Sequence, residues 1–232
     1  MRYELNTGDD LIGTTMAGGA SMGIHESQSR FYENIIGRSE AFISLIFPKI
    51  KELFPEQFEN VSAHDFYLAV NKAEPSLIRT EADELTYSMH IMVRYEIEKR
   101  LMDGSLSTKD LPNEWNRLYK EYLGIDVPCD SMGCLQDSHW SGGALGYFPS
   151  YSLGSAYGAQ FLHKMKQDID IDKLVSENRI DEVTAWLTEK IHKYGMLLTP
   201  AQLIENACGE EFNADYYIEY LTEKYNKIYD LK

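Results

Sequence analysis

The feature of the sequence that most constrains its fold is a regular succession of signals that start and stop α-helices. Thr199, Pro200 and Gln202 form a capping box with proline at the first helical position. Ser62 and Asp65 repeat the spacing of the box. Between such signals apolar residues recur at intervals of three and four. The sequence therefore predicts a mainly α-helical chain.

The helical pattern covers most of the chain, apart from an irregular start at 1–22. Helices are expected over about 23–36 (ended by Gly37), 39–53, from 62 past Val70, 80–103, 112–123, 152–167, 171–178, 179–194, from Thr199 and from Asn213. In the fourth of these, Leu85, Met89, Met92 and Val93 form the apolar repeat. Residues 124–150 are rich in glycine and proline and predict a loop with a strand or two. The expected fold is one multi-helix domain over 1–232, with one glycine-rich loop region and at most a small β element.

Composition excludes several classes of partner. The 232 residues are 44% hydrophobic and 25% charged, as in ordinary globular domains. With 22 Lys and Arg against 37 Asp and Glu, the net charge is −15, which argues against nucleic acid or an anionic membrane as partner. No stretch reads as a signal peptide or a membrane span, and the three cysteines follow no disulfide or zinc-finger spacing. We expect a soluble, cytoplasmic protein.

Three polar stretches interrupt the helical pattern. They run Gly23-Ile24-His25-Glu26-Ser27-Gln28-Ser29-Arg30, Ile78-Arg79-Thr80-Glu81-Ala82-Asp83-Glu84 and Gly133-Cys134-Leu135-Gln136-Asp137-Ser138-His139-Trp140. Adjacent helical residues point about 100° apart, so His25 and Glu26 cannot easily bind one ion together. No pair of histidines spaced four apart completes a site. The residues alone favour an ordinary solvated or paired glutamate.

Together the three stretches resemble the carboxypeptidase Taq family of zinc metallocarboxypeptidases, which carries HESQ, IRxxAD and GxxQDxHW in this order. The resemblance implies that Glu26 is the third ligand of a zinc ion, with cobalt as a possible substitute. The two ligand histidines and the general-base glutamate of that family belong to an upstream His-Glu-x-x-His helix, which these residues lack. No catalytic residue is therefore assigned in this chain. The chain resembles the C-terminal part of a larger catalytic domain.

The first stretch offers groups that could support Glu26. Arg30 and Glu33 share its helical face, and His25 and Gln28 become groups that line the cleft or orient the ligand. The alternative is an ordinary salt bridge within the helix.

The second stretch offers a carboxylate-binding group. A guanidinium recognises a carboxylate through two parallel hydrogen bonds, and the resemblance associates Arg79 with the C-terminal carboxylate of the substrate. The alternative is a structural ion pair between Arg79 and Asp83 or Glu84. Asp83 is expected to cap the helix or to orient another group.

The third stretch combines donors with a glycine-rich backbone, as cleft walls do. His139 and Tyr147 are candidates for binding substrate, with Gln136 and Asp137 supporting them. The alternative is pairing of Asp137 with His139, and buried tyrosines that satisfy loop carbonyls.

The resemblance implies a hydrolase that removes single residues from peptide C-termini and forms homodimers. We expect the isolated chain to be inactive and to bind zinc weakly or not at all. Two alternatives stay open: half of a split enzyme, and a non-catalytic helical protein that binds peptides. A truncated gene product without function is also open.

Overall fold

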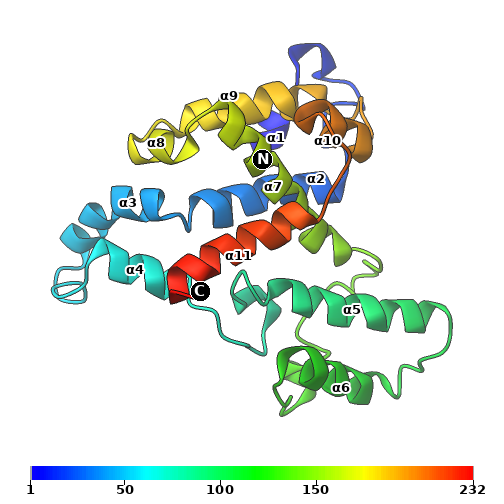
Figure 1. Cartoon of the computed structure of the whole chain (residues 1–232). Helices are drawn as coiled ribbons and strands as arrows, with labels where there is room; N and C mark the ends of the chain where they lie inside the picture. Colours follow the sequence, from blue (N-terminus) through cyan, green and yellow to red (C-terminus); the bar gives the residue numbers. More distant parts are fainter. Residues whose placement is uncertain (1, 232) are drawn as a thin grey trace. The chain divides into compact units, whose positions relative to one another are not determined.

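The computed structural model describes residues 2–231, and every regular element in this range is helical. Figure 1 shows the helices along the chain. The chain forms two compact units, one of residues 1–71 and 153–232 and the other of residues 72–152. The prediction of a mainly helical fold is confirmed, and no strand occurs among residues 2–231. That residues 1–232 make one domain stays a prediction.

The first unit holds most of the helices. They are α1 (Arg2–Leu5), α2 (Met22–Arg30), α3 (Glu40–Leu53), α4 (Ala63–Val70), most of α7 (Pro149–Asp168), α8 (Ile171–Ser176), α9 (Ile180–Lys190), α10 (Pro200–Cys208) and α11 (Asp215–Tyr229). A π-helical segment, η2 (Phe31–Ile36), continues α2. The core of the first unit is built from buried residues of several helices, including Ile24, Phe161, Val183 and Leu203.

The second unit is smaller. It contains α5 (Tyr87–Met102) and α6 (Leu111–Leu123), which lie side by side, and the short turns η3 (Arg79–Glu81) and η4 (Asp130–Met132). Trp115 and Tyr119 of α6 pack with Val93 and Ile97 of α5 in its core.

The helix caps predicted at Ser39, Ser62 and Thr199 are confirmed. Ser39 Oγ accepts the amide of Phe42, and Ser62 with Asp65 forms a complete capping box at α4. Thr199 and Gln202 form the second box, at α10. The predicted cap at Asn213 is wrong by one residue: Ala214 is the N-cap of α11 and makes no side-chain cap hydrogen bond, while Asn213 Oδ1 accepts the amide of Asp215.

The predicted start of the long helix at Thr80 is wrong. Only one 3-10 turn forms there, Ala82 is extended with ψ of 145°, and α5 begins at Tyr87. Asp83 does bind the helix start, because its carboxylate accepts the amide and the hydroxyl of Thr86. It also accepts the amide of Glu74, so this side chain ties two loop segments together.

The predicted apolar face of this helix is also wrong. Leu85, Met89 and Met92 are 37–43% exposed, and of the four residues only Val93 is buried. The buried face carries instead His90, Arg94 and Glu98, spaced four apart. A polar face can point inward only where its groups find partners.

The segment 124–150 contains a short 3-10 turn and no strand. Gly143 and Gly146 have φ of 79° and 75°, a conformation that side chains other than glycine rarely adopt. Residues 1–22 include two short helical turns, and Tyr3 is buried. Among residues 2–231, no helix has both the length and the apolar character needed to cross a membrane.

Candidate functional site

The site residues predicted from sequence divide between the two units. Glu26, His25, Gln28 and Arg30 belong to the first unit. The second unit contains the others, which are Arg79, Asp83, Gln136, Asp137, His139 and Tyr147.

Glu26 lies on α2 where α7 comes closest. A Cβ added at Gly154 of α7 would lie 2.6 Å from Glu26 Cβ and 2.7 Å from its carbonyl carbon. Only glycine allows this approach of the two backbones. The hydroxyl of Ser29 donates to Glu26 Oε2 at 2.8 Å. The backbone at Glu26 is therefore held by packing, and its half-buried carboxylate accepts a local hydrogen bond.

Arg30 pairs with Glu33, with Nη1 and Oε2 2.8 Å apart. This contact is the ordinary ion pair between residues three apart on one helix that sequence analysis kept as the alternative.

His25 contacts the irregular segment before α2. Its Nε2 accepts the amide of Gly19 at 3.2 Å, and its ring centroid lies 5.1 Å from that of Tyr3. A Cβ at Gly19 would lie 2.3 Å from Nε2, so a larger residue there would displace the imidazole. His25 thus fixes the loop that leads into α2.

Gln28 is buried and forms part of an internal polar pair that sequence analysis missed. Its amide nitrogen donates to Ser27 Oγ at 2.9 Å, and its Oε1 lies 2.8 Å from Nε2 of His192. His192 is fully buried, and burial lowers its pKa to about 4. The imidazole is therefore neutral near pH 7 and donates from Nε2 to Gln28. Sequence gave no signal for this pair, because 164 residues separate its members.

The described residues do not complete a metal site. Among residues 2–231, no group of three His, Cys, Asp or Glu side chains is placed to hold a metal ion. A zinc site takes four ligands, and a catalytic one takes three from the protein.

Arg79 is 5% exposed and binds Asp137. Its Nε and Nη2 donate to Asp137 Oδ1 at 3.0 and 2.7 Å, and its Nη1 donates to Tyr87 Oη at 2.9 Å. Burial by itself would lower the pKa of Arg79, but the hydrogen bond to Asp137 and the charges of Tyr87 and Asp137 raise it. The structural partner of Arg79 is therefore Asp137 rather than Asp83 or Glu84.

Arg94 is the second arginine of this cluster, and sequence analysis missed it. Its guanidinium is fully buried, with Nε donating to Asp137 Oδ2 at 2.7 Å and Nη2 donating to Gln136 Oε1 at 2.9 Å. It also lies 4.6 Å from the centroid of the Trp115 ring. Burial raises the pKa of Asp137, but the two guanidinium groups outweigh this and lower it. The sequence did hold a signal for this buried arginine, because His90, Arg94 and Glu98 are spaced four apart and so lie on one face of a helix.

Gln136 binds both arginines. Its Oε1 accepts the backbone amide of Arg79 at 2.9 Å as well as Nη2 of Arg94. Its amide nitrogen donates to the carbonyls of Leu77 and Met132. The loop that carries Gln136 and Asp137 is thereby tied to the segment before α5.

His139 and Tyr147 belong to an aromatic cluster beside these arginines. The His139 ring lies 4.4 Å from Phe148 and 5.6 Å from Tyr147, measured between centroids, and its Nε2 lies 3.1 Å from Tyr151 Oη. Its Nδ1 is 3.9 Å from Asp137 Oδ1, too far for a hydrogen bond. Burial and then the charge of Arg79 lower the pKa of His139. The cluster favours a neutral imidazole.

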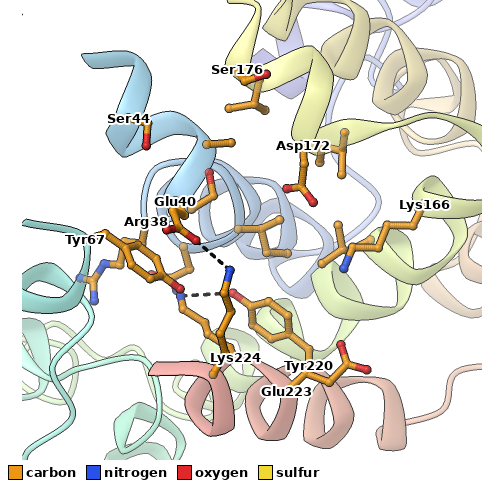
Figure 2. Close-up of a pocket in the computed structure, with 18 of the residues that line it drawn as sticks. Arg38, Glu40, Ser44, Tyr67, Lys166, Asp172, Ser176, Tyr220, Glu223 and Lys224 are labelled. Carbon is orange, nitrogen blue, oxygen red and sulfur yellow. Dashed lines mark hydrogen bonds and ion pairs between the residues drawn. The ribbon is translucent and has the colours of Figure 1, made fainter. Parts of the chain in front are cut away.

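A hollow in the first unit is lined by none of the predicted site residues. It has a volume of about 920 Å³ and is bordered by parts of η2, α3, α4, α7, α8 and α11. Figure 2 shows side chains of both charges around it, among them Glu40, Lys166, Asp172 and Lys224. Lys227, another lining residue, pairs with Glu40 at 2.7 Å.

Known proteins match this chain over almost its whole length. It is 49% identical over 228 residues to carboxypeptidase 1 of Bacillus subtilis (strain 168). The aligned region covers 98% of this chain and 46% of the relative. It is 44% identical over 224 residues to thermostable carboxypeptidase 1 of Pyrococcus furiosus, covering 96% and 45%. The crystal structure of the M32 carboxypeptidase from Deinococcus radiodurans R1 has a TM-score of 0.95 at 38% identity, covering 99% of this chain and 46% of that one.

The chain spans about half the length of the relatives it matches. The family model described as "Carboxypeptidase Taq (M32) metallopeptidase" matches residues 1–225. This match and the similarity over nearly the full chain mean that the protein belongs to the carboxypeptidase Taq (M32) family of metallopeptidases.

Proposed function

We propose that this chain is the C-terminal part of a zinc-dependent carboxypeptidase that removes single residues from the C-termini of peptides. The observation that carries the proposal is the family match over residues 1–225, which contains the three polar stretches in order. A zinc ion supplies, when bound, a Lewis acid that polarises a carbonyl and activates water. Glu26 would be one of its ligands. The rest of the site would come from polypeptide outside these residues.

Arg79 would bind the terminal carboxylate of the peptide. An arginine has five N–H bonds, and three of those of Arg79 are used on Asp137 and Tyr87. Nη1 and Nη2 each keep one N–H bond without an acceptor among residues 2–231. A carboxylate can accept from two such groups at once. His139 and Tyr147 would position the substrate beside it.

The test compares the chain alone with the chain mixed with the upstream part of carboxypeptidase 1 of Bacillus subtilis. The assay is hydrolysis of a blocked dipeptide in the presence of zinc or cobalt. We expect no hydrolysis by the chain alone, recovery on mixing, and loss of that recovery for Glu26→Gln. Tight stoichiometric zinc binding with hydrolysis by the chain alone would overturn the assignment of an incomplete site. The absence of recovery on mixing would count against a split enzyme.

A second candidate function is peptide binding without catalysis. It is supported by Arg79, which stays charged in a cluster made entirely by this chain. Peptide binding that depends on Arg79 and is indifferent to a chelator would favour it. For the family enzyme we also propose a homodimer, which gel filtration of the mixed protein would test, and a cytoplasmic location, which cell fractionation would test.

A further inference from the structure

The cluster around Asp137 contains two arginines with different bonding. Arg94 is fully buried, and each of its three nitrogens has an acceptor in the protein: Asp137 for Nε, Gln136 for Nη2 and the His90 carbonyl for Nη1. Nη1 also lies 3.5 Å from Tyr119 Oη, and Nη2 also lies 2.5 Å from Asp137 Oδ2, so all five N–H bonds have an acceptor. Arg94 therefore has no N–H group and no exposed surface with which to bind a substrate.

Two of the three side chains that accept hydrogen bonds from Arg79, Asp137 and Gln136, also accept from Arg94. Asp137 offers Oδ1 to the guanidinium of Arg79 and Oδ2 to that of Arg94. Gln136 Oε1 accepts both the backbone amide of Arg79 and Nη2 of Arg94. Because a carboxylate can rotate about its terminal torsion, Asp137 alone would leave the orientation of Arg79 loosely defined. Arg94 removes that freedom by fixing the second oxygen.

Aromatic rings hold the two guanidinium planes. Arg94 lies between Trp115 and Phe148, at 4.6 and 5.2 Å from their ring centroids. Arg79 lies 4.9 Å from the ring of Tyr151 and 5.6 Å from that of Phe148. Phe148 therefore contacts both cations, and neither guanidinium can turn without disturbing a packed ring.

We infer that Arg94 is a positioning residue for carboxylate recognition: through Asp137 and Gln136 it orients Arg79 so that one N–H on each of Nη1 and Nη2 stays available to a peptide terminal carboxylate. This inference rests on the proposed role of Arg79. Lysine cannot replace Arg94, because one ammonium cannot reach Asp137 and Gln136 in the fixed geometry of the guanidinium fork.

The first experiment measures the orientation of Arg79 directly in the whole chain. The rate of hydrogen exchange of the Arg79 Nε–H group is followed by NMR in the wild type, in Arg94→Lys and in Arg100→Lys. Arg100 is the matched control, because it lies on the same helix and pairs with Glu114. We expect exchange at least 10-fold faster in Arg94→Lys, with backbone amides of α5 and α6 still protected and Arg100→Lys unchanged. An unchanged Arg79 rate in Arg94→Lys would overturn the inference.

If Arg94→Lys does not fold, the same exchange measurement on Gln136→Met tests the inference. This variant removes one of the two links between Arg94 and Arg79 while keeping both arginines and Asp137. We expect a smaller increase, about 3-fold, in the exchange of Arg79 Nε–H. No increase would overturn the inference.

The second experiment measures recognition. Calorimetry compares a peptide with a free C-terminal carboxylate and the same peptide as its amide, binding to the wild type, Arg79→Met and Arg94→Lys. We expect the preference for the free acid to fall about 10-fold in both variants, with binding of the amide unchanged. Loss of the preference in Arg79→Met alone would overturn the role of Arg94 and leave the proposed function standing. No effect of Arg79→Met would overturn the proposed role of Arg79, and with it the recognition part of this inference.

Discussion

At the scale of single residues, the chain buries polar side chains in pairs whose members lie far apart in sequence. Gln28 with His192 is the example in the first unit, and Asp137 with Arg79 and Arg94 is the example in the second. A buried polar group costs free energy unless a partner satisfies it. These pairs therefore fix side-chain orientations near Glu26 in one unit and around Arg79 in the other.

The buried imidazole of His192 should make stability depend on pH. Its pKa is about 4 in the folded chain and about 6.5 when unfolded, so between these values the unfolded chain binds more protons. Stability therefore rises with pH through this window and falls on acidification. We expect the wild type to lose about 2 kcal/mol more than His192→Gln between pH 7 and pH 5, in urea unfolding at both pH values.

The His192→Gln variant controls for the many carboxylates of this acidic chain, since these contribute equally to the pH dependence of stability in both proteins. Parallel loss of stability in the two proteins would contradict the assignment of a neutral, buried His192.

At the scale of elements, two helices illustrate how packing is achieved. In α5 the buried face carries His90, Arg94 and Glu98 beside the apolar Ile91, Val93 and Ile97. The more exposed face includes Met89, Met92 and Tyr95. In the first unit, α2 and α7 approach closely because Gly154 and Gly158 present no side chain to Glu26 and Ser27. Small residues at a crossing allow two helix backbones to come together.

Gly154→Ala should separate α2 from α7 and destabilise the first unit. The added Cβ would lie 2.6 Å from Glu26 Cβ, which no real contact tolerates. We expect a loss of about 1–3 kcal/mol, the usual cost of overpacking, in urea or thermal unfolding.

Gly158→Ala is the matched control on the same helix. Its nearest contact, the Ser27 carbonyl oxygen, would lie 3.4 Å away, and alanine favours helix over glycine. Equal stability of the two variants would show that the crossing relaxes without cost.

At the scale of the whole molecule, the chain is about half the length of its relatives and consists of two compact units. Each unit has a hydrophobic core of its own. The net charge of −15 is spread over a chain with many surface ion pairs, which individually contribute little to stability.

Removal of metal should leave the stability of this chain unchanged. No group of three potential ligands lies together among residues 2–231. A metal stabilises a fold only to the extent that it binds the folded chain more tightly than the unfolded one. We expect the Tm measured with a chelator to differ by less than about 1 °C from the Tm measured with added zinc. A fall of several degrees that zinc reverses would reveal a complete site.

The sequence by itself determined the helical class, several helix starts and the family. Capping boxes such as Ser62 with Asp65 and Thr199 with Gln202 act within four residues, so their geometry follows from the local sequence. The three polar stretches likewise identified the family, because they are contiguous segments.

Only the tertiary structure decided where α5 begins, which of its faces is buried and what Arg79 binds. Apolar periodicity predicted the wrong face, because it takes no account of polar groups that are buried with partners. The partners of Arg94 come from residues 136 and 137, more than forty positions away in sequence. Local propensity cannot encode contacts of that separation. The free energy that turns Arg94 inward comes from side chains that only the folded chain brings together.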